Sequence, residues 1–192
     1  MISEEAVRAR VVGLQRSGGG VPKLPIERAV VHASGMDGDW QRNRTHHGGP
    51  DRALCLYSMD LLDALTAEGH AASPGALGEN VTIGGLKWSA MQPGVRLLIG
   101  SVETEITAFA WPCTTIAGAF RDGDFTRVSE KLHPGWSRVY ARILRAGEIV
   151  LGDGVEILAV TPTLSRGQPL EHRLESGVTP NTRQVGVVQR NE

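Results

Sequence analysis

Glycine and proline divide this chain into short apolar segments. The 192 residues include 24 glycines and 10 prolines, spread along most of the length. Both residue types interrupt helices and strands and favour turns. Frequent turns between short apolar segments are typical of many short strands, and they disfavour a helical bundle. The sequence therefore predicts a mainly β fold.

Most of these segments have the composition of β-strands. They are rich in β-branched residues, and several alternate polar with apolar side chains. Residues 59–70 differ, because apolar side chains at positions 61, 62 and 65 predict a helix that Gly69 ends. A short helical turn is expected at 116–120, followed by a long loop over 121–136. The predicted strands are residues 7–14, 27–32, 53–58, 81–83, 95–100, 103–110, 137–144, 149–151 and 155–160.

Length and composition predict one soluble domain. A chain of 192 residues, 41% hydrophobic and 21% charged, is long enough for one full core and short for two. We expect this domain to cover residues 1–160, with residues 161–192 as a C-terminal extension outside the core. The net charge of −1 offers no basic field for binding nucleic acid.

The N-terminus and the cysteines predict a cytoplasmic protein. Residues 1–5 contain no basic stretch leading into an apolar one, so no secretory signal is expected. No apolar run approaches the ~20 residues of a membrane span. Cys55 and Cys113 are too few for a secreted disulfide framework, which favours a reducing compartment. A bridge between these two cysteines remains open.

Cys113 is the principal candidate for chemistry. It lies just past the predicted strand 103–110, where a side chain is held firmly and stays accessible. Its thiolate can act as a nucleophile or bind a soft metal. The alternative is a small buried apolar side chain, the commoner fate of a cysteine outside a disulfide. Cys55, inside the apolar run 53–58, is expected in the core.

The densest polar cluster precedes the predicted strand 53–58. Its paired glycines would let the backbone approach a ligand, and its arginines offer planar donors to an oxyanion. One alternative is a solvated turn in which Asp51 and Arg52 pair at the surface. Zinc bound by His46, His47 and Cys113 is disfavoured, because neighbours on an extended chain face opposite ways. The cluster consists of Arg42, Arg44, Thr45, His46, His47, Gly48, Gly49, Pro50, Asp51 and Arg52.

Two other polar stretches have local interpretations. Glu79 and Asn80 precede the predicted strand 81–83 and either cap a turn or place a carboxylate and an amide in a pocket. Residues 35–39 lack the spaced oxygen ligands of an EF-hand and are expected to form a turn between strands. The chain contains no GxGxxG, Walker A, CxxC or HExxH motif.

Several short motifs follow one another along the chain in a recognisable order. Four of them are Gly38-Asp39, residues 47–54 (HGGPDRAL), residues 75–80 (GALGEN) and Pro112-Cys113, and Gly152-Asp153 comes after them. In this order they resemble the MOSC family, a domain found at the C-terminus of molybdenum cofactor sulfurases and in stand-alone bacterial proteins. The resemblance covers roughly residues 5–160 and implies a β-barrel with a few peripheral helices. It departs from the family where Gly100-Ser101 replaces a common Gly-Asp, and where Thr45 and Arg44 stand instead of a lysine before HGG.

The resemblance implies that the molybdenum cofactor, a pterin carrying a dithiolene and a phosphate, is bound. Cys113 matches the cysteine that ligates molybdenum in reductase members or carries sulfur in sulfurase-type members. A soft sulfur ligand suits that metal. Arg44 is added from its charge alone, as a phosphate or pterin contact. The expected cofactor-binding residues are Arg44, His47, Gly48, Gly49, Asp51, Arg52, Glu79 and Asn80.

The activity implied by the resemblance is reduction of N-hydroxylated compounds, such as hydroxylaminopurines or amidoximes. Electrons would come from a separate flavin or iron–sulfur protein, since this chain has neither motif. The alternatives are a carrier or sulfur-transfer module for the cofactor, and a barrel with a decayed site that serves in interactions. We expect no room for the pyridoxal-phosphate domain of full-length sulfurases. A homodimer remains one option.

Overall fold

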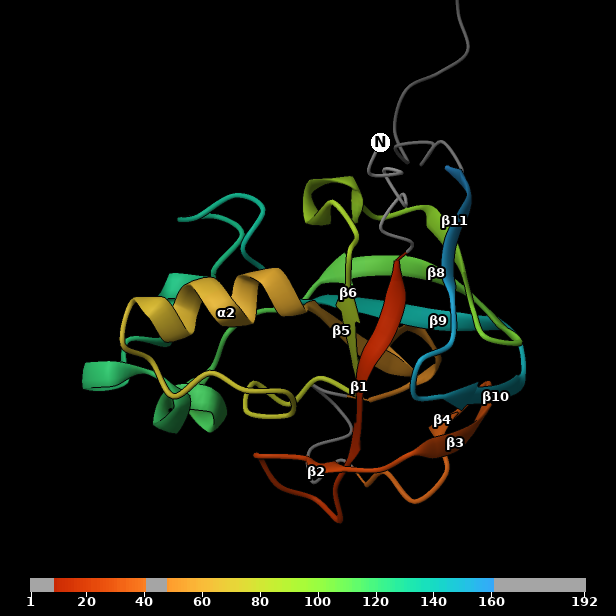
Figure 1. Ribbon diagram of the computed structural model, residues 1–192, viewed down its shortest axis with the longest axis horizontal. Helices are drawn as coiled ribbons and strands as arrows, with labels where there is room; N and C mark the ends of the chain where they lie inside the picture. Colours follow the sequence, from red (N-terminus) through yellow and green to blue (C-terminus); the bar gives the residue numbers. More distant parts are fainter. Residues whose placement is uncertain (1–8, 41–47, 161–192) are drawn as a thin grey trace, which may run out of the picture.

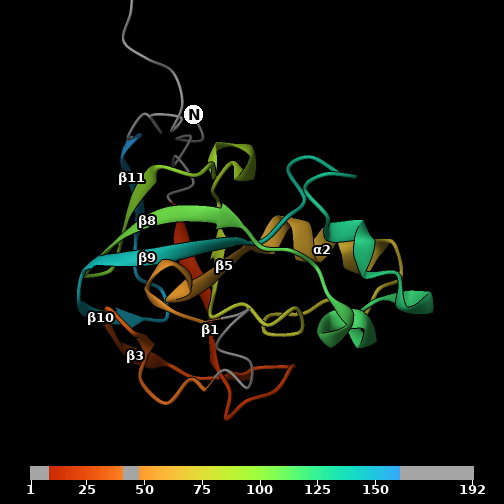
Figure 2. The ribbon, with the colours of Figure 1, turned by 180° about the vertical axis from the view of Figure 1, so that it is seen from behind.

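A curled eight-stranded sheet forms most of the protein (Figures 1 and 2). The computed structural model describes residues 9–40 and 48–160, so the expected extension at 161–192 lies outside the described residues. In the large sheet the strands follow the order β11-β7-β8-β9-β5-β6-β1-β2. Their bounds are β1 Arg10–Arg16, β2 Leu24–Pro25, β5 Leu54–Ser58, β6 Val81–Gly84, β7 Val95–Ile99, β8 Val102–Phe109, β9 Val139–Arg145 and β11 Val155–Val160.

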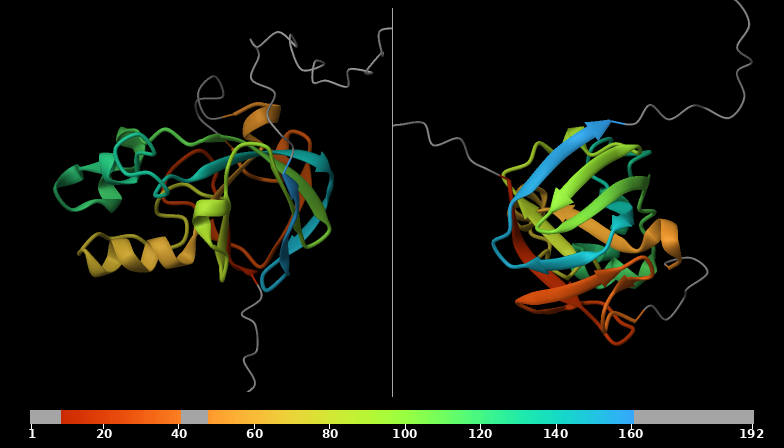
Figure 3. Two further views of the ribbon diagram at one scale, coloured as in Figure 1. Left: turned by 90° about the horizontal axis from the view of Figure 1, so that it is seen from above. Right: turned by 90° about the vertical axis from the view of Figure 1, so that its right-hand side faces the viewer.

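The mainly β class is confirmed, but the ladder does not close into a continuous barrel. The strand order leaves β11 and β2 as the two ends of the sheet. The sheet nevertheless curls until the start of β1 reaches the turn before β11, as Figure 3 shows. There the Val11 N–H donates to the Asp153 carbonyl at 2.8 Å, and the Val155 N–H donates to the Ala9 carbonyl at 2.9 Å. A single bridge, Arg10 to Gly154, is the only ladder pairing recorded between the two segments in the described chain.

The β7–β8 hairpin shows why these segments become strands. Alternate residues of β7 are buried, as expected for a sheet with one face on the core. Antiparallel pairing places Arg96 opposite Glu105, and their side chains lie 3.2 Å apart on the outer face. The inner face is filled by side chains that are essentially inaccessible to solvent, among them Leu14, Leu54, Leu56, Ile83, Leu97, Ile99 and Ile106.

A second, three-stranded sheet differs from the expectation at two turns. It pairs β10 (Gly147–Val150), β3 (Arg28–His32) and β4 (Gly35–Met36). The predicted turn at 35–39 is therefore partly strand, and β10 begins at Gly147, two residues before the predicted strand 149–151, so the turn that precedes it is shorter than expected. Strands of two residues have no local pattern, because only pairing with a neighbour defines them.

The predicted helix is present as α2, Met59–Ala67. Ser58 caps its N-terminus, since the Ser58 hydroxyl accepts a hydrogen bond from the Leu61 N–H at 3.4 Å. Leu62 and Leu65 are its buried residues, and Gly69 follows with a φ of +89°. No described helix is both long and apolar enough to cross a membrane.

The segment expected to be a long loop is a packed lobe beside α2 (Figure 1). It contains two 3-10 helices, η4 Arg121–Gly123 and η5 Phe125–Val128. A third, η3 Thr114–Ala119, precedes them and confirms the helical turn predicted at 116–120. Val128 is fully buried, and the Arg127 guanidinium donates twice to the Glu68 carboxylate, at 2.8 and 2.6 Å. The same guanidinium lies 3.5 Å from the centre of the Trp136 ring. These contacts anchor the lobe to the end of α2.

Candidate functional site

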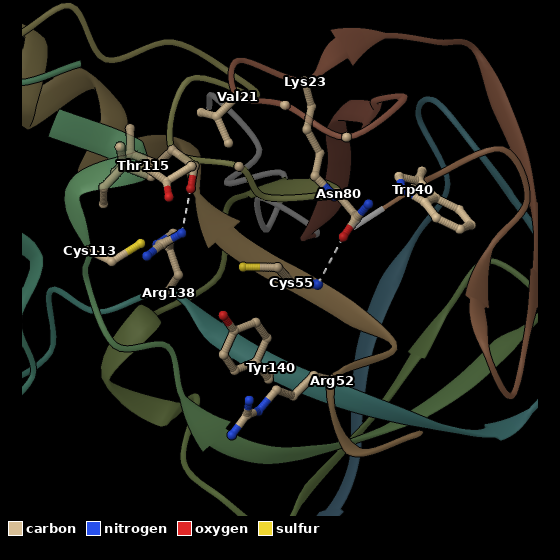
Figure 4. A pocket seen from close by; sticks show the side chains of 15 residues that line it. Val21, Lys23, Trp40, Arg52, Cys55, Asn80, Cys113, Thr115, Arg138 and Tyr140 are labelled. Carbon is tan, nitrogen blue, oxygen red and sulfur yellow. Dashed lines mark hydrogen bonds between the residues drawn. The ribbon is translucent and has the colours of Figure 1, made fainter. Parts of the chain in front are cut away.

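A cavity of about 490 Å³ lies between the large sheet and the lobe (Figure 4). Its wall comes from segments far apart in the sequence: 19–23, residue 40, 52–55, 77–80, 113–116 and 138–140. The volume falls within the 300–1,000 Å³ that is usual for small-molecule sites. The polar and sulfur-bearing side chains in this wall are Lys23, Trp40, Arg52, Cys55, Asn80, Cys113, Thr115, Arg138 and Tyr140.

Cys113 lies where the sequence predicts it, a few residues past the end of β8. Its backbone is extended, with φ −145° and ψ 171°, and it forms the N-cap of η3. The Cys113 carbonyl accepts the Ile116 N–H at 3.1 Å, which fixes the start of that helical turn. The side chain is half-buried and lines the cavity. The neighbouring Trp111 is 80% exposed and is not part of the cavity wall.

Cys55 lies in the core, as expected, and it also lines the cavity. It is buried on β5, but its sulfur lines the same cavity as Cys113 (Figure 4). Burial raises the pKa of the Cys55 thiol, although the positive charges of Arg138 and Lys23 oppose that shift. Cys55 is therefore held as a neutral thiol, which is a weak nucleophile. No disulfide joins the two cysteines.

Asn80 lines the cavity, as predicted, and ties its wall together. Its side-chain oxygen accepts the Cys55 N–H at 3.1 Å, and its nitrogen donates to Asp39 Oδ2 at 3.0 Å. That same Asp39 oxygen lies 2.6 Å from the Lys23 ammonium. One amide thus connects β5 to the ion pair that holds Lys23.

Glu79 is not in the cavity wall, contrary to its expected role as a cofactor contact. Its side chain is fully buried, and Oε1 accepts the Gly75 N–H at 2.7 Å and the Thr82 hydroxyl at 3.3 Å. Its second oxygen, Oε2, is buried without a hydrogen-bond partner. Burial raises the pKa of Glu79. The carboxylate therefore closes the turn before β6, which is the capping alternative.

Of the described residues of the HGGPDR element, 48–52, one lies in the cavity wall. Arg52 ends η1 (Pro50–Arg52), and its guanidinium lies 5.6 Å from the centre of the Tyr140 ring. Asp51 is exposed and points toward Arg142, 3.6 Å from Nε, so its predicted contact with the cofactor is not supported by this placement. Gly48 and Gly49 are also outside the wall. Arg44 and His47 lie outside the described residues.

Arg138 and Tyr140 are wall residues that the sequence did not single out. Arg138 is 5% exposed, and its Nη1 donates to the Leu77 carbonyl. Burial raises the pKa of Tyr140 to about 12, so its hydroxyl stays protonated at neutral pH. Arg138 directly precedes β9 and Tyr140 is its second residue; the alternation of this segment gives no sign of which polar side chains turn inward. Lys23 was missed because only its tertiary pairing with Asp39 buries it.

The resulting site combines sulfur, cationic and amide groups around one space. Two thiols, three cations and a tyrosine hydroxyl face the same cavity. Within residues 9–40 and 48–160 no three histidine, cysteine or acidic side chains cluster in a way that would hold a metal ion. Such a wall suits an anionic ligand that contains a soft-metal or sulfur centre.

Comparison with known proteins places this architecture in a family. The MOSC domain matches residues 43–156. Uncharacterized protein YflK of Bacillus subtilis (strain 168) is 28% identical over 142 residues, which are 73% of this chain. The match covers 63% of YflK, less than two thirds of its length.

Two crystal structures share the fold at low sequence identity. A hypothetical protein superposes with a TM-score of 0.66 at 22% identity, over 81% of this chain and 70% of the other. YiiM from Geobacillus stearothermophilus superposes with a TM-score of 0.61 at 20% identity, over 79% of this chain and 75% of YiiM. At these identities the likeness shows the fold alone.

Proposed function

This chain belongs to the MOSC domain family, which is associated with molybdenum cofactor binding, and on that premise we propose that it binds this cofactor in the cavity. The observation that supports the proposal is the placement of Cys113 in the same wall as three cations. A half-buried thiol offers one soft ligand to molybdenum. Lys23, Arg52 and Arg138 suit the negative charge of a phosphate-bearing pterin.

We propose further that the bound protein reduces N-hydroxylated compounds, such as hydroxylaminopurines or amidoximes. The cofactor would supply the two-electron chemistry, with electrons from a separate flavin or iron–sulfur protein. The chain itself would bind and orient the reactants and limit access of water. Tyr140, protonated at neutral pH, can donate a hydrogen bond to an acceptor in the cavity. A cytoplasmic setting would keep both thiols reduced.

The test begins with the metal content of the full chain from a host that makes the cofactor. We expect molybdenum and pterin close to one per chain in the wild type, and loss of molybdenum in Cys113→Ser. Cys55→Ala is the matched control, because Cys55 lines the same cavity with a buried neutral thiol. It should retain molybdenum. A wild-type protein without molybdenum, or equal loss in both variants, would refute Cys113 as the ligand.

The reductase assay uses the same preparations with a chemical reductant as electron source. Turnover of hydroxylaminopurine or an amidoxime should follow molybdenum content across the three proteins. Protein that contains the cofactor and is inert on every N-hydroxylated substrate would remove the reductase proposal and leave cofactor binding intact.

A carrier or sulfur-transfer role is the second candidate, and the position of Cys113 in the cavity wall favours it. If Cys113 carried a persulfide, attack by a nucleophile of the acceptor on the outer sulfur would transfer that sulfur atom and leave the Cys113 thiolate. Mass spectrometry would show one added sulfur atom on Cys113 and its transfer to an acceptor. Absence of that species after incubation with a sulfur donor would exclude this role.

A further inference from the structure

Arg138 is a buried cation with an incomplete set of partners. It is 5% exposed, and its Nη1 donates to a backbone carbonyl, that of Leu77. Its Nε is buried and has no hydrogen-bond partner. Among residues 9–40 and 48–160 no carboxylate lies within ion-pair distance of it. A guanidinium stays charged at any physiological pH, so this charge is buried without a counterion.

Other charged groups near the cavity have different surroundings. Lys23 is neutralised by Asp39 at 2.6 Å. Arg52 lies over the Tyr140 ring. Glu79 interacts electrostatically with Arg138, but burial is the larger influence and raises the pKa of Glu79, which favours its neutral form. Glu79 is therefore a poor counterion for Arg138.

The Arg138 side chain points into the cavity on the side of Cys113 and Thr115 (Figure 4). Its unused donor and planar shape match the oxygens of a phosphate. We propose that Arg138 is the centre of an oxyanion-binding subsite at the Cys113 end of the cavity, which takes a phosphate group or a similar tetrahedral oxyanion. The oxyanion could come from two sources: the phosphate of the cofactor, or a free oxyanion. For the first source, this inference deepens the proposed function and rests on it.

The first experiment measures binding of inorganic phosphate to the full chain from a host that cannot make the cofactor. Isothermal titration in a chloride-containing buffer should show saturable binding. Arg138→Met should weaken it about tenfold or more, the value of one charge-assisted hydrogen bond. Arg138→Lys should fall between, because lysine keeps the charge and loses the planar fork. Arg142→Met is the control, since Arg142 lies on β9, four residues after Arg138, and already faces two carboxylates.

These variants make the inference refutable even if one of them fails to fold. Far-UV circular dichroism and the unfolding midpoint establish which variants are native. If Arg138→Met is unfolded, the loss of phosphate affinity in Arg138→Lys tests the inference instead. Absence of saturable phosphate binding by the wild type, or affinity unchanged in the native Arg138 variants, would overturn the subsite.

A second arm identifies the source of the oxyanion. Protein from a cofactor-making host should no longer bind inorganic phosphate if the cofactor's own phosphate fills the subsite. It should still bind phosphate if the subsite takes a free oxyanion. A protein that contains molybdenum but binds no phosphate without the cofactor would refute this inference alone. A protein that binds phosphate and never contains molybdenum would refute the proposed function alone.

Discussion

Asp39 holds the Lys23 ammonium at the cavity wall, and its removal should cost much of the stability of the fold. The two side chains are 3% and 9% exposed, with Nζ and Oδ2 2.6 Å apart. Oδ2 also accepts the Asn80 amide at 3.0 Å, and Oδ1 accepts the Ser17 N–H at 2.9 Å. Asp39→Ala would therefore leave a buried ammonium and two further donors without an acceptor.

The expected loss follows from the depth and geometry of this pair. At an effective dielectric constant of about 20, unit charges 2.6 Å apart attract by about 6 kcal/mol. Desolvation of both groups offsets part of that attraction, so the net worth of the pair is smaller. Removing one partner leaves the other charge buried without compensation, and such changes cost about 3–5 kcal/mol of stability. A domain that is stable by about 5–15 kcal/mol would be left close to unfolding.

Urea unfolding followed by tryptophan fluorescence measures this loss in a double-mutant cycle. Asp39→Ala should be strongly destabilised, and Asp39→Ala combined with Lys23→Met should recover part of the loss, because no buried charge then remains. Asp37→Ala, at an exposed acid two residues away, should change stability by less than about 0.5 kcal/mol. A loss under about 1 kcal/mol in Asp39→Ala, or additive effects in the double variant, would refute the reasoning.

Two further predictions concern Glu79 and the lobe. Burial raises the pKa of Glu79 above 4.5, so the folded state binds its proton more tightly than the unfolded state. The stability of wild type relative to Glu79→Gln should therefore fall as pH rises above 4.5 through the folded-state pKa, which urea unfolding at several pH values would measure. An accessible carboxylate would have the same pKa in both states, so the absence of this fall would contradict the prediction. Arg127→Ala should lower stability by about 1 kcal/mol after screening, and Arg127→Lys by less, in thermal unfolding; no change would mean that the contacts with Glu68 and Trp136 do not anchor the lobe.

The sequence predicted the long strands and the helix because their signals are local. Alternation over β7 and β8 reports burial on one face whatever the partner strand is. The two-residue strands β2 and β4 carry no such signal. Residues 121–136 were expected as a loop because 3-10 helices of three or four residues leave no periodic pattern.

The site was predicted at the level of segments more than of side chains. Cys113, Arg52 and Asn80 line the cavity as expected. These three residues lie at strand ends and in short turns, and the sequence can locate such positions. Arg138 and Lys23 were missed, since long charged side chains are usually exposed and only the assembled fold shows them buried.

The GALGEN element acts on the cavity through the turn that it builds as well as through the residues that line the wall. Gly75 has a φ of +87°, and a Cβ at that position would lie 2.3 Å from the Lys23 carbonyl oxygen. Only glycine allows this approach, in which the Gly75 carbonyl also accepts the Lys23 N–H at 3.0 Å. Glu79 closes the same turn, and Asn80 joins it to Cys55 and to the acceptor of the Lys23 ammonium. The motif therefore sets where one cation of the cavity stands, and a change in it would alter ligand binding through the position of that cation.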